Sequence, residues 1–167
     1  MNPAGLHVEA RGDREIVMTR SFNAPRSLVL QAFTQPELVK RWLLGPDGWS
    51  MPLCEIDLRV GGKYRYVWRH DKSGQEMGVS GVFREVIAPE RVVHSEKFDQ
   101  PWYEAECIVT LVLTEHAGKT VITQSLLFDS SKTRDAVLKS SMQRGVEASY
   151  NRLEAILASP AAEGAAN

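Results

Sequence analysis

The sequence predicts an α+β domain in which a seven-stranded, curved antiparallel sheet packs around one long carboxy-terminal helix. Two observations predict this class. Six strand-like segments with short connections follow one another in the middle of the chain, as in an antiparallel meander. The stretch from about Lys132 to Ala158 has the 3.6-residue period of a helix. With one earlier strand and two short helices, the expected order is β-α-α-β6-α, which leaves one long helix to cover one face of the sheet.

The elements before the meander are a strand and two short helices. Glu15–Phe22 alternates apolar with polar residues and is rich in β-branched side chains, which favours a strand. A proline in a first helical turn predicts a short helix over Pro25–Phe33. Thr34 and Glu37 have the spacing of a capping box, so we expect a second helix there that stops at Gly45–Pro46.

The meander is divided by turn signals such as Gly61–Gly62 and Ala88–Pro89. In one of its segments Tyr64, Tyr66 and Trp68 alternate with basic residues, so this aromatic set should face the interior of the sheet. The expected strands are Ser50–Leu58, Lys63–His70, Gln75–Ile87, Val92–Phe98, Ala105–Glu115 and Lys119–Phe128. The last helix should pack against the inward face of these strands.

The chain should form one domain over residues 14–158. Residues 1–13 and 159–167 are polar or small, so we expect disordered tails there. The net charge of −1, with both signs interspersed, gives no basic surface for nucleic acid. No apolar run approaches the roughly 20 residues of a membrane span, and the start does not read as a signal peptide. We therefore expect a cytoplasmic protein that binds neither nucleic acid nor membrane.

The sequence contains no clear motif for binding a metal or a cofactor. Cys54 and Cys107 lie in β-patterned stretches among apolar neighbours, which favours reduced, buried thiols. The four histidines are scattered, and no cluster has the spacing of metal ligands. Gly118–Thr120 lacks the upstream glycine of a phosphate-binding loop. Neither a metal nor a cofactor is expected, and no residue is assigned as catalytic.

Several short motifs together carry a resemblance to a known family. They are Phe22–Arg26, Pro36–Trp42, Cys54–Tyr66, Gly81–Glu85, Pro89–Arg91 and Gly118–Thr120. The set resembles bacterial single-domain proteins of the activator-of-Hsp90-ATPase-like family, which lies in the helix-grip superfamily of START-like and Bet v 1-like proteins. The resemblance covers about residues 14–158. It implies that the sheet grips the last helix, that two short helices close one end, and that a hydrophobic cavity lies between sheet and helix.

A ligand site is accordingly expected between the sheet and the long helix. The inward stripe of that helix is bulky at its ends but nearly bare at Gly145 and Ser149. Because protein interiors are densely packed, this bare region either packs closely against an aromatic side chain or leaves room for a guest. The residues expected at the site are Trp42, Trp49, Tyr64, Tyr66, Trp68, Met77, Phe83, His94, Met142, Gly145 and Ser149.

The facing of Val92–Phe98 determines how polar this site is. If His94 and Glu96 face inward, they are polar groups on a mostly apolar wall, which is the arrangement that orients a ligand or tunes a general base. If they face outward, they are ordinary surface residues. The sequence alone leaves both readings open.

The leading functional prediction is non-enzymatic binding of a small hydrophobic or aromatic molecule. A second reading is an enzyme of cyclase or hydrolase type that uses the same cavity, with a tyrosine or His94 as acid and base. A third, which the resemblance suggests, is a partner module that activates an Hsp90-type chaperone ATPase. A homodimer that forms through exposed Trp49 or Trp102 is also open.

Overall fold

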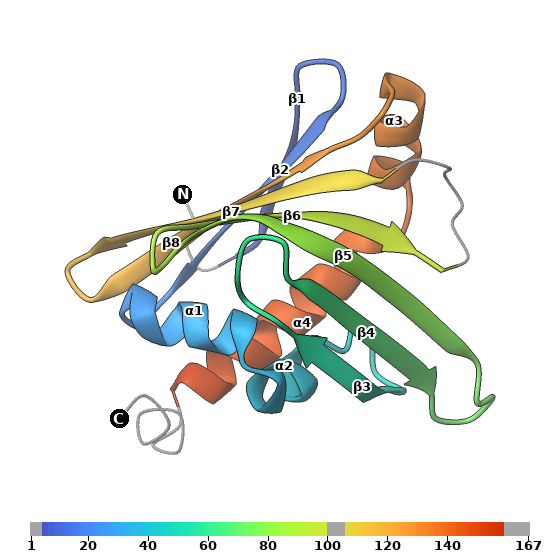
Figure 1. Ribbon diagram of the computed structural model, residues 1–167, viewed down its shortest axis with the longest axis horizontal. Coiled ribbons are helices and arrows are strands. Elements are labelled where there is room, and N and C mark those ends of the chain that lie inside the picture. Colours follow the sequence, from blue (N-terminus) through green and yellow to red (C-terminus); the bar gives the residue numbers. More distant parts are fainter. Residues whose placement is uncertain (1–4, 100–105, 159–167) are drawn as a thin grey trace.

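Eight antiparallel strands form one curved sheet around the helices in the computed structural model, which describes residues 5–99 and 106–158 (Figure 1). The strands are β1 His7–Arg11, β2 Glu15–Phe22, β3 Trp49–Ile56, β4 Lys63–His70, β5 Glu76–Ile87, β6 Arg91–Phe98, β7 Cys107–His116 and β8 Lys119–Leu127. The helices are α1 Arg26–Thr34, α2 Pro36–Trp42, α3 Ser131–Lys139 and α4 Met142–Leu157. The first residue of the strand predicted from Ala105 lies outside the described residues. Trp102 and the expected tail over 159–167 also lie outside them.

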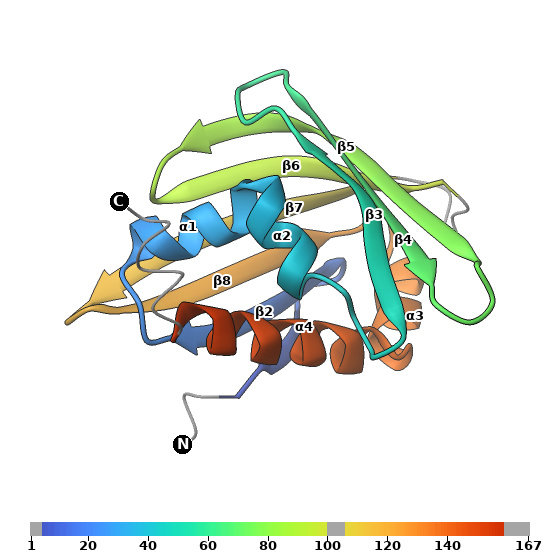
Figure 2. The same cartoon turned by 90° about the horizontal axis from the view of Figure 1, so that it is seen from below.

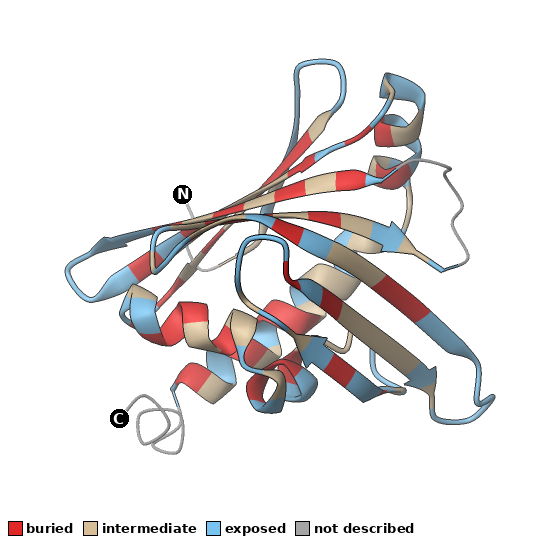
Figure 3. Cartoon of the chain, in the orientation of Figure 1, coloured by how far each residue is buried: buried red, intermediate tan, exposed pale blue. Residues whose placement is uncertain are grey.

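The strand order in the sheet is β1-β2-β8-β7-β6-β5-β4-β3. The six strands of the meander are therefore neighbours in sequence order, as predicted, and β2 pairs with β8, the last of them. The sheet curves, and α1, α2 and α4 lie within its concave side (Figure 2). Buried residues gather on the strand faces and helix faces that meet in this interior (Figure 3).

The predicted count of seven strands is wrong, because β1 lies inside the segment that we expected to be a disordered tail. Four of its five residues are exposed, so its sequence carries no burial pattern. It is held as an edge strand by antiparallel pairing with β2, in which His7 lies opposite Thr19 and Arg11 opposite Glu15. Main-chain pairing with β2 and packing of Leu6 and Val8 against the core hold this strand in place, and neither is visible in the apolar periodicity of its sequence.

The prediction of one continuous helix from Lys132 to Ala158 is also wrong, because α3 and α4 are separate helices. The break falls at Ser140 and Ser141. The Ser140 hydroxyl donates to the carbonyl of Val137 and accepts from the amide of Met142 at 3.2 Å, so its side chain takes over hydrogen bonds that helical backbone would make. The two helices can therefore follow different directions (Figure 2).

The expected capping box at Thr34 and Glu37 does not form. Thr34 is the last residue of α1, and its hydroxyl donates to the carbonyl of Leu30 at 2.8 Å. The N-cap of α2 is Gln35, and Pro36 occupies the first turn, where its missing N–H costs nothing. The two short helices are therefore joined by a single extended residue.

Helix α4 is held mainly by other helices, so its main chain stays at a distance from the strands that face it. Its close main-chain neighbours are α1, α2 and α3 rather than strands. A buried arginine reaches it from the sheet: Arg20 of β2 donates to Asn151 at 3.0 Å and lies 3.6 Å from Glu154. Leu153 is fully buried in the main apolar cluster. None of the described helices is long and apolar enough to cross a membrane.

Candidate ligand-binding cavity

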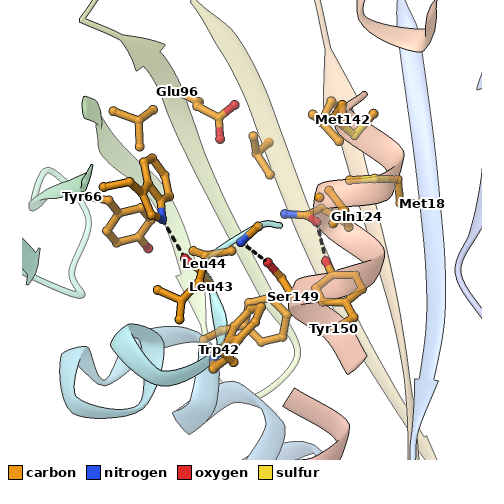
Figure 4. A pocket seen from close by; sticks show the side chains of 18 of the residues that line it. Met18, Trp42, Leu43, Leu44, Tyr66, Glu96, Gln124, Met142, Ser149 and Tyr150 are labelled. Atoms are coloured by element: carbon orange, nitrogen blue, oxygen red, sulfur yellow. Dashed lines mark hydrogen bonds between the residues drawn. The ribbon is translucent and has the colours of Figure 1, made fainter. Parts of the chain in front are cut away.

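A cavity of about 480 Å³ lies between the concave face of the sheet and α4 (Figure 4). Strands β4 to β8 supply one wall, α4 supplies the other, and the loop between α2 and β3 contributes Leu43 to Pro46. All eleven residues that the sequence places at the site lie on this lining. The lining is mostly apolar and aromatic, and a few polar side chains are set into it.

Strand β4 forms the aromatic part of the wall, in the orientation that the alternation predicts. The Tyr64 ring lies 5.0 Å from the Tyr66 ring, and Tyr66 lies 5.8 Å from Trp68, both measured between centroids. Tyr64 is buried, and its hydroxyl donates to the carbonyl of Ser95 at 2.8 Å. The indole of Trp68 donates to the carbonyl of Leu43 at 2.7 Å, which fixes the loop over the wall. Figure 4 shows Tyr66 beside this loop.

The remaining predicted aromatic and methionine residues lie at different depths. Trp42 is 1% exposed, and its indole donates to the carbonyl of Ala32 at 2.9 Å, so it belongs as much to the core as to the cavity. Phe83 is buried against Tyr64. Trp49 is partly buried and packs its ring edge-on against His70, while Met77 is 44% exposed. The last two therefore lie where the cavity meets solvent.

The structure settles the facing of β6, because both His94 and Glu96 line the cavity. The His94 ring packs edge-on against Tyr64 with centroids 4.8 Å apart, and its Nδ1 lies 2.9 Å from the carbonyl oxygen of Ser95. Burial lowers the pKa of His94, so the ring is neutral at physiological pH, with Nδ1–H donating to that carbonyl. Burial raises the pKa of Glu96 to about 7. Two titratable groups thus interrupt an apolar wall.

The bare part of the α4 stripe is covered by the α2–β3 loop rather than by an aromatic ring. The hydroxyl of Ser149 accepts from the amide of Gly45 at 2.8 Å, and Arg152 donates to the Gly45 carbonyl at 2.6 Å. A Cβ added to Gly145 would lie 3.7 Å from Cδ of Pro46, an ordinary contact distance. Small residues at these two positions let the loop approach the helix, and the cavity continues beside them.

Sequence reasoning missed the part of the lining that β2, β7 and β8 supply. Gln124 is the polar member of this set: it accepts a hydrogen bond of 2.7 Å from the Tyr150 hydroxyl, and its amide nitrogen points into the cavity (Figure 4). The strict alternation of β7 and β8 could have identified these positions, because the inward set of β8 includes Ile122 and Leu126. The missed residues on these strands are Met18, Val109, Leu111, Gln124 and Leu126, and α4 adds Val146 and Tyr150.

Neither described thiol belongs to the cavity lining, and the lining residues His94 and Glu96 are not part of a larger described group of possible metal ligands. Cys54 and Cys107 are both free and buried, and burial raises the pKa of Cys54 to about 11, so its thiol is protonated at neutral pH. Over residues 5–99 and 106–158, no three His, Cys, Asp or Glu side chains are grouped closely enough to hold a metal ion. The polar chemistry of the cavity therefore rests on Glu96, His94, Tyr66 and Gln124.

An open antiparallel sheet curved around a carboxy-terminal helix, with a cavity between them, defines the helix-grip class of proteins. The family model described as Activator of Hsp90 ATPase homolog 1-like protein matches residues 23–158. The chain belongs to this family, as its motifs indicated. No match was found among curated proteins.

Solved structures agree with this assignment. A crystal structure of a protein from Rhodobacter sphaeroides is 29% identical, with a TM-score of 0.87 over 92% of this chain and 98% of that one. A protein from Nitrosomonas europaea is 25% identical, with a TM-score of 0.76 over 89% and 96% of the two chains. An AHSA1-like protein from Aeromonas hydrophila, 20% identical with a TM-score of 0.66 over 83% and 92%, shares the fold.

Proposed function

We propose that this protein binds a small hydrophobic or aromatic molecule in the cavity between the sheet and α4. The observation that carries the proposal is the cavity itself, about 480 Å³ in volume and lined by aromatic and aliphatic side chains. Pockets of about 300–1,000 Å³ with few polar groups are typical of sites for small organic ligands. The AHSA1-like fold family commonly binds hydrophobic ligands, which supports the same conclusion.

The arrangement of the walls supports binding of a guest with a flat, apolar body. Tyr66 and Trp68 offer ring surfaces on β4. On α4, Met142 offers a flexible apolar surface and Val146 a compact one. A guest in van der Waals contact with both walls would supply the dispersion contacts that the lining atoms lack when the cavity is empty. Gln124 and Tyr66 provide hydrogen-bonding groups that can orient a polar substituent of the guest.

Binding is better supported than acid–base turnover by a tyrosine and His94. The hydroxyl of Tyr64 and Nδ1 of His94 both contact the same main-chain oxygen, that of Ser95. These hydrogen bonds hold the two rings as parts of the wall and commit the Tyr64 proton to the backbone. For His94 the hydrogen bond at Nδ1 leaves Nε2 as the basic atom, but burial lowers the pKa of the ring and so makes it a weaker base.

Blocking the cavity tests the proposal directly. Gly145→Leu places a leucine side chain beside Pro46, where it extends from α4 into the cavity region. We expect the affinity for N-phenyl-1-naphthylamine, a neutral apolar fluorophore, to fall at least about ten-fold. Stability should not fall, because replacing glycine inside a helix gains up to about 1 kcal/mol of helix propensity. Fluorescence titration and urea unfolding of the same samples measure both quantities.

The matched control is Ala155→Leu, which adds leucine to an exposed position of the same helix. It should leave the titration unchanged. Equal binding by Gly145→Leu and wild type would contradict the proposed site. Absence of any bound apolar molecule in native mass spectrometry, together with no fluorophore binding by wild type, would contradict the proposed function itself.

A further inference from the structure

Glu96 is the acidic side chain of the cavity lining. It lies on β6 between His94 and Phe98, which also line the cavity, and across the sheet it is paired with the fully buried Cys107 of β7. Figure 4 shows its carboxylate among the side chains that line the pocket. Its position is therefore fixed by strand register and not by a loop.

Several other carboxylates on or beside the strands have an arginine partner, which Glu96 lacks. They include Glu15 with Arg11, Glu76 with Arg69, Glu85 with Arg91, and Asp99 just after β6 with Arg65. Over residues 5–99 and 106–158, the Glu96 carboxylate has no hydrogen bond and no ion pair. The protein thus leaves unpaired the acid that faces the cavity.

Within the part of the chain that the structure describes, no positively charged side chain contacts Glu96. The titratable groups that face it are Tyr66 from β4, the neutral His94 on its own strand, and Cys107 from β7. Towards the cavity, the lining of α4 and β8 is uncharged, with Met142, Val146, Ser149, Gln124 and Leu126. A carboxylate taken from water without a partner is costly, so this site gains free energy from any guest that brings a cation or a strong donor.

We propose that Glu96 is the recognition point for a protonated amine, so that the guest of this cavity is a hydrophobic amine. The inference rests on the proposed binding function and names its ligand class. The ammonium group would donate to the Glu96 carboxylate, while the apolar body lies along Tyr66 and Trp68, whose ring faces also attract cations. The Tyr66 hydroxyl, for which no partner is found among the described residues, supplies an acceptor on the same wall.

The test compares three probes with the same naphthyl body: 2-(2-naphthyl)ethylamine, 2-(2-naphthyl)ethanol and 3-(2-naphthyl)propanoate. Calorimetric titration at pH 8 should show that wild type binds the amine at least about ten-fold more tightly than the alcohol, and the carboxylate most weakly. In Glu96→Gln the amine should lose this advantage, while binding of the alcohol stays within about two-fold. Glu55→Gln, which neutralises an exposed carboxylate on β3, should behave as wild type.

A second arm uses wild type alone and does not depend on a variant. Between pH 6 and pH 8 the affinity for the amine should rise as Glu96 ionises, while the affinity for the alcohol stays flat. Equal affinity of wild type for amine and alcohol, or no effect of Glu96→Gln on their ratio, would overturn the amine proposal and leave the binding function standing. Failure of wild type to bind any of the three probes would count against the binding function itself.

Discussion

Two aromatic clusters of the interior differ in how far protein covers their rings, although residues of both line the cavity. The filled cluster consists of Phe22, Phe33, Trp42 and Tyr150, and it lies where α1, α2 and α4 meet the sheet. The cavity cluster consists of Tyr64, Tyr66, Trp68, Phe83 and His94, and it lies on β4 to β6. Ring separations are similar, for example 4.8 Å between Phe33 and Trp42 and 5.0 Å between Tyr64 and Tyr66.

The two clusters differ in the number of structural elements that pack against their rings. In the filled cluster, rings from two helices and a strand close on Tyr150 from several sides, and its hydroxyl finds Gln124. In the cavity cluster, neighbouring rings come from adjacent strands of one sheet, and α4 stands away from them. Side chains from one sheet can cover only one wall, so a void remains wherever the facing helix does not approach. Aromatic content alone therefore does not distinguish core from pocket.

The largest effect should come from removing an indole at each end. Trp42 and Trp68 both donate to a main-chain carbonyl, but Trp42 is 1% exposed and Trp68 only partly buried. We expect Trp42→Ala to lower the free energy of unfolding by about 4 kcal/mol, and Trp68→Ala by about half as much, because the second indole is less buried and loses fewer contacts. Urea unfolding measures both. Equal losses would mean that the two clusters are packed alike.

A smaller effect should appear in the pH dependence of stability through Glu96. Its pKa is raised from 4.5 to about 7 in the folded protein, so the folded state binds the proton more tightly than the unfolded state between these values. The free energy of unfolding should therefore fall as pH rises through this window, by on the order of 2 kcal/mol once partial exposure is allowed for. The lowered pKa of His94 acts in the opposite direction, because its contribution is lost as pH falls below about 6.5.

The two titrations overlap, so the informative quantity is the difference between wild type and Glu96→Gln. Unfolding measured at several pH values from 4.5 to 8 should show the downward slope of Glu96 in wild type only. The upward contribution of His94 should remain in both proteins. Identical pH profiles would mean that the Glu96 carboxyl is well solvated in the folded state.

The smallest effect should come from deleting a single hydroxyl at each end. Tyr150→Phe leaves the Gln124 carbonyl without its donor in a buried setting and should cost about 1 kcal/mol. Tyr66→Phe should change stability by less than about 0.5 kcal/mol, because the Tyr66 hydroxyl faces the cavity and not a protein group. Thermal unfolding of the two variants side by side checks the pair. A larger loss for Tyr66→Phe would show that its hydroxyl has a structural partner.

The sequence by itself determined the family, the meander, the two short helices and the inward facing of the β4 aromatics, because these depend on local signals: alternation, turn residues and short motifs. It also placed all eleven expected residues on the cavity lining. It did not reveal β1, whose order comes from pairing with β2, nor the break at Ser140, where a side chain competes with the helix backbone.

Only the tertiary structure decided which way His94 and Glu96 face and why Gly145 and Ser149 are small. The β6 alternation permits either facing, and the choice is made by which face of the curved sheet turns toward the cavity. The small residues on α4 could be covered by an aromatic ring, a loop or a bound guest. In the structure the loop at Gly45–Pro46 packs beside them, and a cavity remains next to it. Whether space is filled depends on how far one element stands from another, and that distance is set by contacts between residues remote in the sequence.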